Sequence, residues 1–363
     1  MEVLVKKTFE LSDEEIVAIY ALFEEVFGQK RDVATFRENY SNTPLGYSYH
    51  SILLNEEGDT VGFHSCMPFY YQRGNERFMV ALGIDSMVKK AYRDYFSFHD
   101  MIVQCQKRLK EDGCVLRIGF PNDNSYPILK KGLKHRDVGK LTTYCMIRNI
   151  GAVKRRLAFL NIFSRIFSRA QYACSFLSIG HRPYSFKYHK ERESFDKVRY
   201  RWFGGDYRKV SRKGSQFVYK LERYNEVETA FLLEVWPLSR SAFEEAVRYI
   251  YKKERKGIDM IIYVGNLPFT PIGLFSVPHR LEPKHFNFTC KPLVKDFFDD
   301  SLYDIRNWEV NLSNSTSRNG FISSITTLHA PRSSGKGLKC VSMRIWSAFF
   351  VSWRRQIRRL LFS

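Results

Sequence analysis

The order of the predicted elements indicates an α/β fold, and three adjacent segments carry that prediction. Alternate positions of residues 77–88 are apolar, as in a strand: Phe78, Val80, Leu82, Ile84 and Val88. Apolar residues then follow at helical spacing: Phe98, Met101, Ile102, Cys105 and Leu109. Gly113 is placed to end this helix, and Val115 to Phe120 is a second short apolar strand.

The segment 80–139 continues in the same order. Ser97 and Asp100 have the spacing of a capping box at the start of the helix. After the second strand, Ser125 is placed to cap a short helix that Gly132 ends. The segment therefore predicts a strand, a turn, a helix, a second strand and a short closing helix.

The second half of the chain repeats this order. Two strand-like segments, 217–221 and 230–236, precede a helix, and the apolar strand 258–264 follows it. Ser241 and Glu244 have capping-box spacing at the start of that helix. A second domain built on the same plan is therefore expected.

The segment 80–139 resembles the cofactor-binding half of the GNAT (Gcn5-related) N-acetyltransferase superfamily. The stretches that carry the resemblance are Met87-Val88, Tyr92-Arg93-Asp94-Tyr95-Phe96-Ser97, Gly119-Phe120-Pro121-Asn122 and Gly132-Leu133-Lys134. The resemblance implies an α/β fold of the α+β type, with a mixed, largely antiparallel sheet flanked by helices and a second, degenerate GNAT-like domain. The stretches 119–122 and 281–288 are similar to tandem GNAT-like acetyltransferases of bacterial surface-polysaccharide clusters.

The resemblance also implies a site. In the family the fourth strand splays and pairs with the pantetheine arm of acyl-CoA, while amides at the start of the next helix hold the pyrophosphate. Met87 and Val88 would then pair with pantetheine. The phosphates would be lined by Arg93, Asp94, Tyr95, Phe96, Ser97 and Asn122. Asp85 would relay a proton from the amine, and Tyr126 is the nearest substitute for the family's general-acid tyrosine.

The implied activity is transfer of an acetyl or other acyl group from acyl-CoA to a primary amine, without a metal. Only Arg93 matches the family's phosphate turn, because bulky residues stand where glycines let a backbone approach an anion. The alternative is a non-catalytic GNAT-like binding protein that has lost the cofactor site. Simpler interpretations also stay open: Asp85 as an ion-pair partner, Asn122 as a turn residue and Tyr126 as a packing residue.

Composition excludes several classes of protein. A hydrophobic content of 44% with 15% aromatic residues is typical of a globular chain and not of a disordered one. The seven cysteines are scattered without CxxC spacing, which favours reduced thiols in a cytoplasm and argues against a zinc site. Nucleic-acid binding is the weakest candidate, because the basic residues are dispersed and no nucleic-acid motif is present.

The net charge of +20 is unevenly spread, since residues 315–363 contain no Asp or Glu. Residues 343–362 have the pattern of a basic amphipathic helix, so peripheral contact with the inner face of a membrane is one expectation. A non-native end, such as a shifted reading frame, is the other. The expected location is otherwise cytoplasmic, and the basic charge suits an amine acceptor such as a nucleotide- or lipid-linked sugar.

Four segments are expected along the chain. Residues 1–150 form the acyl-CoA-binding domain, 151–190 a helical connector, 191–312 the second GNAT-like domain and 313–363 the basic tail. The first residues have the pattern of a strand and not of a secretion signal. No stretch is apolar for long enough to predict a membrane-spanning helix.

Overall fold

The computed structural model describes residues 1–314 except 29, 42, 123–124, 179, 181, 192–206, 225, 280–281 and 283–284. The predictions for residues 315–363 lie outside the described residues. The described residues form two compact units: unit 1 holds Met1–Lys140, 186–191 and Phe286–Glu309, and unit 2 holds Leu141–Ser185, 207–285 and 310–314. Each unit is discontinuous in sequence, whereas the predicted domains are contiguous ranges, and their boundaries stay a prediction.

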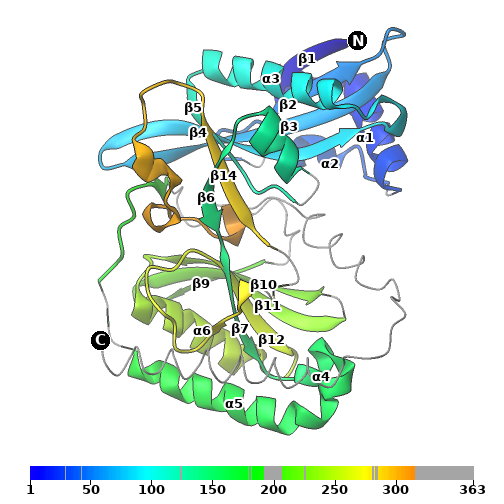
Figure 1. The fold of residues 1–363 in the computed structure, drawn as a ribbon. Helices are drawn as coiled ribbons and strands as arrows, with labels where there is room; N and C mark the ends of the chain where they lie inside the picture. The colour runs from blue at the N-terminus through cyan, green and yellow to red at the C-terminus, as the bar shows by residue number, and fades with distance from the viewer. Residues whose placement is uncertain are drawn as a thin grey trace. The chain divides into compact units, whose positions relative to one another are not determined.

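Unit 1 is built on one sheet in the order β1-β2-β3-β4-β5-β14-β6, with β8 paired to β3 (Figure 1). Its strands are β1 (Glu2–Lys7), β2 (Tyr49–Leu54), β3 (Thr60–Arg73), β4 (Glu76–Val88), β5 (Cys114–Gly119), β6 (Arg136–Lys140), β8 (His189–Lys190) and β14 (Asn287–Pro292). Strands β4 and β5 pair in parallel, and the other described pairs in this sheet are antiparallel. The predicted mixed, largely antiparallel sheet is confirmed.

Helices cover both faces of this sheet. They are α1 (Asp13–Phe27), α2 (Thr35–Ser41) and α3 (Tyr95–Glu111). On one face, Phe36 of α2 contacts the ring of Phe63 in β3. On the other face, Met101 of α3 approaches Gly62, the preceding residue of β3. Because successive side chains of a strand project to opposite faces, α2 and α3 lie on opposite sides of the sheet.

Helix α3 begins earlier than its sequence pattern suggests. Its N-cap is Asp94, whose carboxylate accepts a hydrogen bond from the Ser97 amide at 2.7 Å. The predicted capping box of Ser97 and Asp100 is therefore wrong, because Ser97 already lies inside the helix and its own amide is capped by Asp94. Gly113 follows the helix with a φ of 86°, a left-handed conformation that glycine adopts without a steric penalty.

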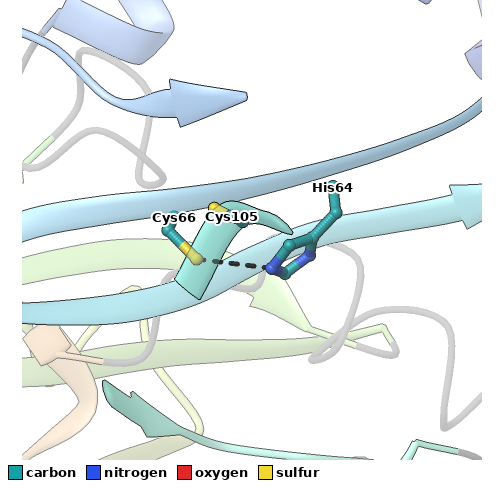
Figure 2. A group of neighbouring side chains, drawn as sticks. All are labelled: His64, Cys66 and Cys105. Atoms are coloured by element: carbon teal, nitrogen blue, oxygen red, sulfur yellow. Dashed lines mark hydrogen bonds between the residues drawn. The ribbon is translucent and has the colours of Figure 1, made fainter. Parts of the chain in front are cut away.

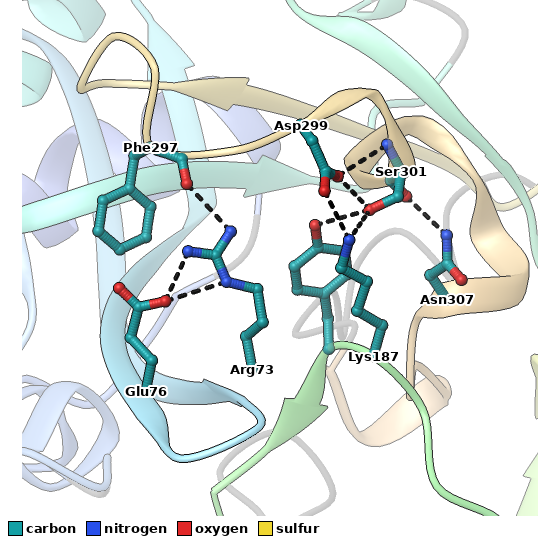
Figure 3. A network of polar contacts seen from close by, with 8 residues as sticks. Arg73, Glu76, Lys187, Phe297, Asp299, Ser301 and Asn307 are labelled. Carbon is teal, nitrogen blue, oxygen red and sulfur yellow. Dashed lines mark hydrogen bonds and ion pairs between the residues drawn. The ribbon is translucent and has the colours of Figure 1, made fainter.

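The last described segment of unit 1, residues 293–309, is fixed by polar contacts to earlier parts of the unit (Figure 3). Arg73, at the end of β3, donates to the carbonyl of Phe297 at 3.0 Å. Lys187 donates to Asp299 at 2.7 Å. These contacts join regions more than a hundred residues apart, which explains why unit 1 is discontinuous.

Unit 2 contains a second sheet, in the order β13-β7-β12-β11-β10-β9. Its strands are β7 (Thr142–Ile147), β9 (Tyr207–Arg212), β10 (Ser215–Tyr224), β11 (Val227–Trp236), β12 (Met260–Gly265) and β13 (Phe275–Ser276). Its helices are α4 (Ile150–Val153), α5 (Asn161–Cys174) and α6 (Arg240–Glu254). Strands β11 and β12 pair in parallel around α6, just as β4 and β5 do around α3, so the repeated order of elements is confirmed.

Glu244 has a different role from the one its spacing predicts. The N-cap of α6 is Ser239, which accepts from the Ala242 amide, so the helix begins before the predicted capping box of Ser241 and Glu244. The buried Glu244 carboxylate instead accepts hydrogen bonds from the amides of Ile272 and Gly273. A Cβ at Gly273 would lie 2.6 Å from that carboxylate, so a larger residue there would displace Glu244 from its hydrogen bonds.

Burial makes Glu244 a source of pH-dependent stability. Desolvation raises its pKa from 4.5 to about 7, although the amide hydrogen bonds and nearby arginines oppose the shift. Because the folded chain binds this proton more tightly than the unfolded chain, the free energy of unfolding should fall by about 3 kcal/mol as pH rises from about 4.5 to about 7. Urea unfolding monitored in unit 2 should show this slope. Glu244→Gln should flatten it, whereas the exposed control Glu228→Gln should keep it; a slope retained in Glu244→Gln would contradict the assignment.

The described cysteines are Cys66, Cys105, Cys114, Cys145, Cys174 and Cys290, and all carry free thiols. Cys105 and Cys114 are fully buried, as expected for small hydrophobic residues. Within the described residues, no helix is both long and apolar enough to cross a membrane.

Candidate functional site

Strands β4 and β5 separate before β4 ends. Their parallel pairing runs from Met79 with Cys114 to Leu82 with Ile118, while β4 continues to Val88. On its other edge β4 stays paired, with Met87 opposite Phe63 and Val88 opposite Gly62. Strand β5 therefore supplies no partner to residues 83–88 of β4, and an extended ligand could pair with that backbone edge as a strand would.

A β-bulge lies within this separated part of β4. The single residue His64 of β3 faces both Asp85 and Ser86, because the register shifts between Phe63 and Ser65. Asp85 has a φ of 40°, in the left-handed region that one class of β-bulge requires of its first residue. Asp85 and Ser86 are also accessible to solvent, although Ile84 and Met87 on either side are buried. The bulge thus opens the strand at the point where β5 departs.

The bulge also reverses the facing of Asp85. Strict alternation places Asp85 with Met79 and Ala81, opposite the apolar positions Phe78 to Ile84, and so predicts that these three residues lie on the non-core face. That assignment is wrong, because Met79 and Ala81 are buried in a cluster with Cys105 of α3. The extra residue turns Asp85 toward α2, where the Tyr40 hydroxyl donates to its Oδ2 at 2.6 Å.

The Asp85 carboxylate is held by two neighbours and remains accessible to solvent. Tyr40 is itself buried, and Arg31 lies 3.9 Å from the same carboxylate oxygen. The Asp85 side chain keeps 19% of its surface exposed, so an incoming amine or a water molecule can reach it. Since a positive φ is unfavourable for most residues but tolerated by Asp, the bulge and the residue type fit each other.

The turn before α3 is filled by the chain itself. Asp94 accepts from both the amide and the hydroxyl of Ser97, and the Ser97 amide hydrogen bond is the main cause of the lowered Asp94 pKa. Arg93 donates to the carbonyl of Val88 at 3.1 Å. Phe96 projects into solvent with 73% of its surface exposed, and Tyr95 contributes the first helical residue. The carboxylate of Asp94 therefore takes the position that a bound phosphate would need.

The two predicted residues after β5 are held by local contacts. Asn122 accepts a hydrogen bond from the Ser125 amide at 2.9 Å, ahead of the short helix Ile128–Gly132. The Tyr126 hydroxyl donates to Asp137 at 2.8 Å and accepts from Lys130 at 3.2 Å. None of the hydrogen bonds of these described residues joins Tyr126 to Asp85. The roles predicted for Asn122 and Tyr126 stay predictions.

A buried polar cluster beneath α3 escapes sequence reasoning (Figure 2). His64 lies 3.3 Å from the Cys66 thiol, and Cys105 reaches the same place from α3. The neighbouring Cys105 thiol, together with the charges of His64 and Arg117, lowers the pKa of Cys66 against the effect of burial, while Cys66 and burial raise the pKa of Cys105. Arg117 lies 3.0 Å from the His64 ring, and this positive charge opposes a metal cation among these donors. An arginine inside an apolar strand is the signal that could have indicated the cluster.

A second group of possible metal ligands lies in unit 2. The Nδ1 atoms of His279 and His285 lie 2.7 and 3.6 Å from one carboxylate oxygen of Glu282. The other oxygen accepts from the Thr143 amide at 3.0 Å. These contacts satisfy the buried carboxylate without a metal, and unit 1 holds all the residues predicted to act in acyl transfer.

Comparison with known proteins identifies the architecture. No protein-family model matches the chain, and no curated protein matches it significantly. A protein of unknown function from Enterococcus faecalis V583, described as a probable N-acyltransferase, is 12% identical with a TM-score of 0.50, over 81% of this chain and 73% of that one. A GCN5-related N-acetyltransferase from Anabaena variabilis is 12% identical with a TM-score of 0.52, over 80% and 73%.

A GCN5-related N-acetyltransferase from Kribbella flavida is 10% identical, with a TM-score of 0.51 over 80% of this chain and 71% of that one. Identities this low establish a shared fold and not a shared activity. Each match covers 80% or more of this chain, so it includes parts of both units. The chain therefore has the fold of the GCN5-related N-acetyltransferases.

Proposed function

We propose that the chain is an acyl-CoA-dependent N-acyltransferase acting on a primary amine. One observation carries the proposal: β4 has no strand partner on its β5-facing edge from residue 83 onward, and the bulge within this stretch holds Asp85, whose carboxylate is accessible. An open strand edge suits the amide groups of pantetheine, and an accessible carboxylate in the same stretch suits deprotonation of an amine. The fold shared with known acetyltransferases supports the same activity.

The proposed reaction needs no covalent enzyme intermediate. The amine nitrogen attacks the thioester carbonyl carbon, an N–C bond forms, and the C–S bond breaks. The proton lost by the amine passes to Asp85, directly or through a water molecule, and the departing thiolate takes a proton from solvent. Tyr40 would hold the Asp85 carboxylate in place through its 2.6 Å hydrogen bond.

The residues fit the two halves of acyl-CoA unequally. The edge of β4 suits pantetheine, but Asp94 occupies the helix amides that would hold the pyrophosphate. The neighbouring cations Lys90 and Arg93 are exposed, and Arg93 would exchange its hydrogen bond to the Val88 carbonyl for one to the phosphates. Binding therefore requires the Asp94 carboxylate to leave the end of α3 or the phosphates to lie beside it.

The acceptor is proposed from charge alone. A primary amine on an amino sugar carried by a nucleotide or a lipid would bring phosphate groups that suit the net charge of +20. A role in polysaccharide synthesis would follow from such an acceptor. Screening thiol release from acetyl-CoA against a panel of amino sugars and simple amines would identify the acceptor class.

Binding of acetyl-CoA measured by calorimetry tests the proposal. Asp94→Asn should tighten binding roughly two- to fivefold, because Asn still caps the helix while the negative charge beside the phosphates is removed. Asp59→Asn, an exposed change in the loop before β3, is the matched control and should leave affinity unchanged. Equal acetyl-CoA affinity of the wild type and Asp94→Asn would show that the phosphates do not bind beside Asp94.

The second candidate is a non-catalytic protein with this fold, and the Asp94 cap is the observation that favours it. A protein that binds no cofactor does not need free amides at the start of α3, so a capping side chain can occupy them. Absence of acetyl-CoA binding at millimolar concentration, in both the wild type and Asp94→Asn, would exclude the transferase and leave this candidate.

A further inference from the structure

Helix α5 presents its polar side to the interior and its apolar side to solvent. Ser164, Ser168 and Gln171 are buried within unit 2. Six large apolar side chains of α5 and its flanking turns are exposed, by 57 to 73%: Phe159, Ile162, Phe163, Ile166, Phe176 and Leu177. We call these six residues the α5 patch. Exposed apolar residues are common singly, but a group on one helix marks an interaction surface.

The orientation of α5 is fixed by its buried polar residues. The Ser164 hydroxyl donates to the carbonyl of Arg148 at 2.7 Å and accepts from the Ile150 amide at 3.3 Å. Asn161, at the start of the helix, accepts from the Gly151 amide at 2.8 Å. Rotating α5 to bury the α5 patch would break these bonds and bury apolar side chains where polar groups now meet. The α5 patch is therefore a stable surface of unit 2.

Basic residues border the α5 patch. Arg155 and Arg156 precede α5, and Arg165 and Arg169 project from it; all four side chains are exposed. Residues 138–190 contain no Asp or Glu, so no acidic side chain of this segment offsets them. An apolar helix face with arginines beside it is the pattern of a helix that lies in the interface of an anionic membrane.

Charge decides among the possible occupants of this surface. A second copy of the chain would bring its own four arginines against these, which is electrostatically unfavourable. Residues 315–363 include nine Lys or Arg and no Asp or Glu, so they are repelled for the same reason. An anionic lipid surface offers both an apolar phase for the α5 patch and negative charge for the arginines.

We propose that the α5 patch and its arginines dock unit 2 on an anionic membrane surface. The helix would lie parallel to the surface, with Phe163 and Ile166 among the acyl chains and Arg165 and Arg169 at the headgroups. This contact differs from the one predicted for residues 343–362. It is also independent of acyl transfer, so either proposal can fail without the other.

Co-flotation of the untagged full-length chain with lipid vesicles tests the docking. The chain should float with an equal mixture of phosphatidylcholine and phosphatidylglycerol, should bind phosphatidylcholine alone far more weakly, and should dissociate as salt is raised. Phe163→Ser combined with Ile166→Ser should abolish flotation. Arg165→Gln combined with Arg169→Gln should weaken partitioning roughly fivefold for each arginine, with little effect on folding.

Matched controls separate this surface from other sources of binding. Phe9→Ser combined with Val17→Ser removes exposed apolar side chains of unit 1 and should leave flotation unchanged. Full flotation of the Phe163→Ser, Ile166→Ser variant would overturn the proposal and direct attention to residues 343–362. A native dimer that this double variant converts to a monomer, with no vesicle binding by either, would instead assign the α5 patch to a second copy.

Discussion

Asp85→Asn is expected to reduce turnover by roughly 10²- to 10⁴-fold while leaving acetyl-CoA affinity unchanged, as removal of a general base should. Asparagine can hold the left-handed bulge, because its short polar side chain tolerates the φ of 40° that Asp85 adopts. It cannot, however, accept the amine's proton. The measurement is the steady-state rate of thiol release with a primary-amine acceptor, set beside calorimetric binding of acetyl-CoA.

Two further variants make the Asp85 result specific. Asp59→Asn changes an exposed carboxylate and should retain full turnover. Tyr40→Phe removes the 2.6 Å hydrogen bond to Asp85 and should lower turnover by about tenfold, since it affects the position of the carboxylate and not its identity. Asp85→Asn with near-normal turnover would remove Asp85 from the mechanism and leave it as an ion-pair partner of Arg31.

Trp308→Ala should cost about 3–5 kcal/mol of the free energy of unfolding of unit 1, as large-to-small changes of a buried aromatic residue do. The Trp308 side chain is fully buried, and its indole N–H donates to the carbonyl of Leu302 at 2.8 Å. Its ring contacts Tyr71 and Tyr188, with centroids 5.2 and 4.8 Å away. Urea unfolding combined with hydrogen exchange in β3 and β4 reports the change.

Trp308→Phe and Phe9→Ala accompany that experiment. Trp308→Phe keeps an aromatic ring but loses the hydrogen bond, so about 1–2 kcal/mol is expected. Phe9, with 65% of its surface exposed, should be nearly neutral as alanine. A loss below about 1 kcal/mol for Trp308→Ala would show that the segment 293–309 is not part of the cooperative core of unit 1.

The elements that local patterns predict are those that depend on local chemistry. Period-two alternation finds β4, helical spacing finds α3, and a short apolar run finds β5 to within one residue. The helix starts are less predictable, because Asp94 and Ser239 compete with nearby residues of equal capping ability. The residue that caps a helix is selected by the backbone conformation between the preceding strand and the helix. Residue spacing does not predict that conformation.

The candidate site also has a part that residue order predicts and a part that depends on tertiary contacts. Residue order places Met87, Val88 and the turn at 92–97 between a strand and a helix, as the resemblance implies. The partnership of Asp85 with Tyr40 and Arg31 could not be predicted, because these residues meet only when α2 packs on the sheet. The bulge also reverses the facing that alternation assigns to Asp85, since one extra residue changes the parity of a strand.

The sequence by itself determined the kind and order of the elements, the repeat of strand, helix and strand in the second half, and the resemblance to the acetyltransferases. These follow from the periodicity of apolar residues, which is local. The tertiary structure alone decided that β14 lies between β5 and β6, that β5 leaves β4 before its end, and that α5 exposes its apolar side. Each of these arrangements is stabilised by contacts between residues far apart in the chain. A local sequence pattern therefore does not predict them.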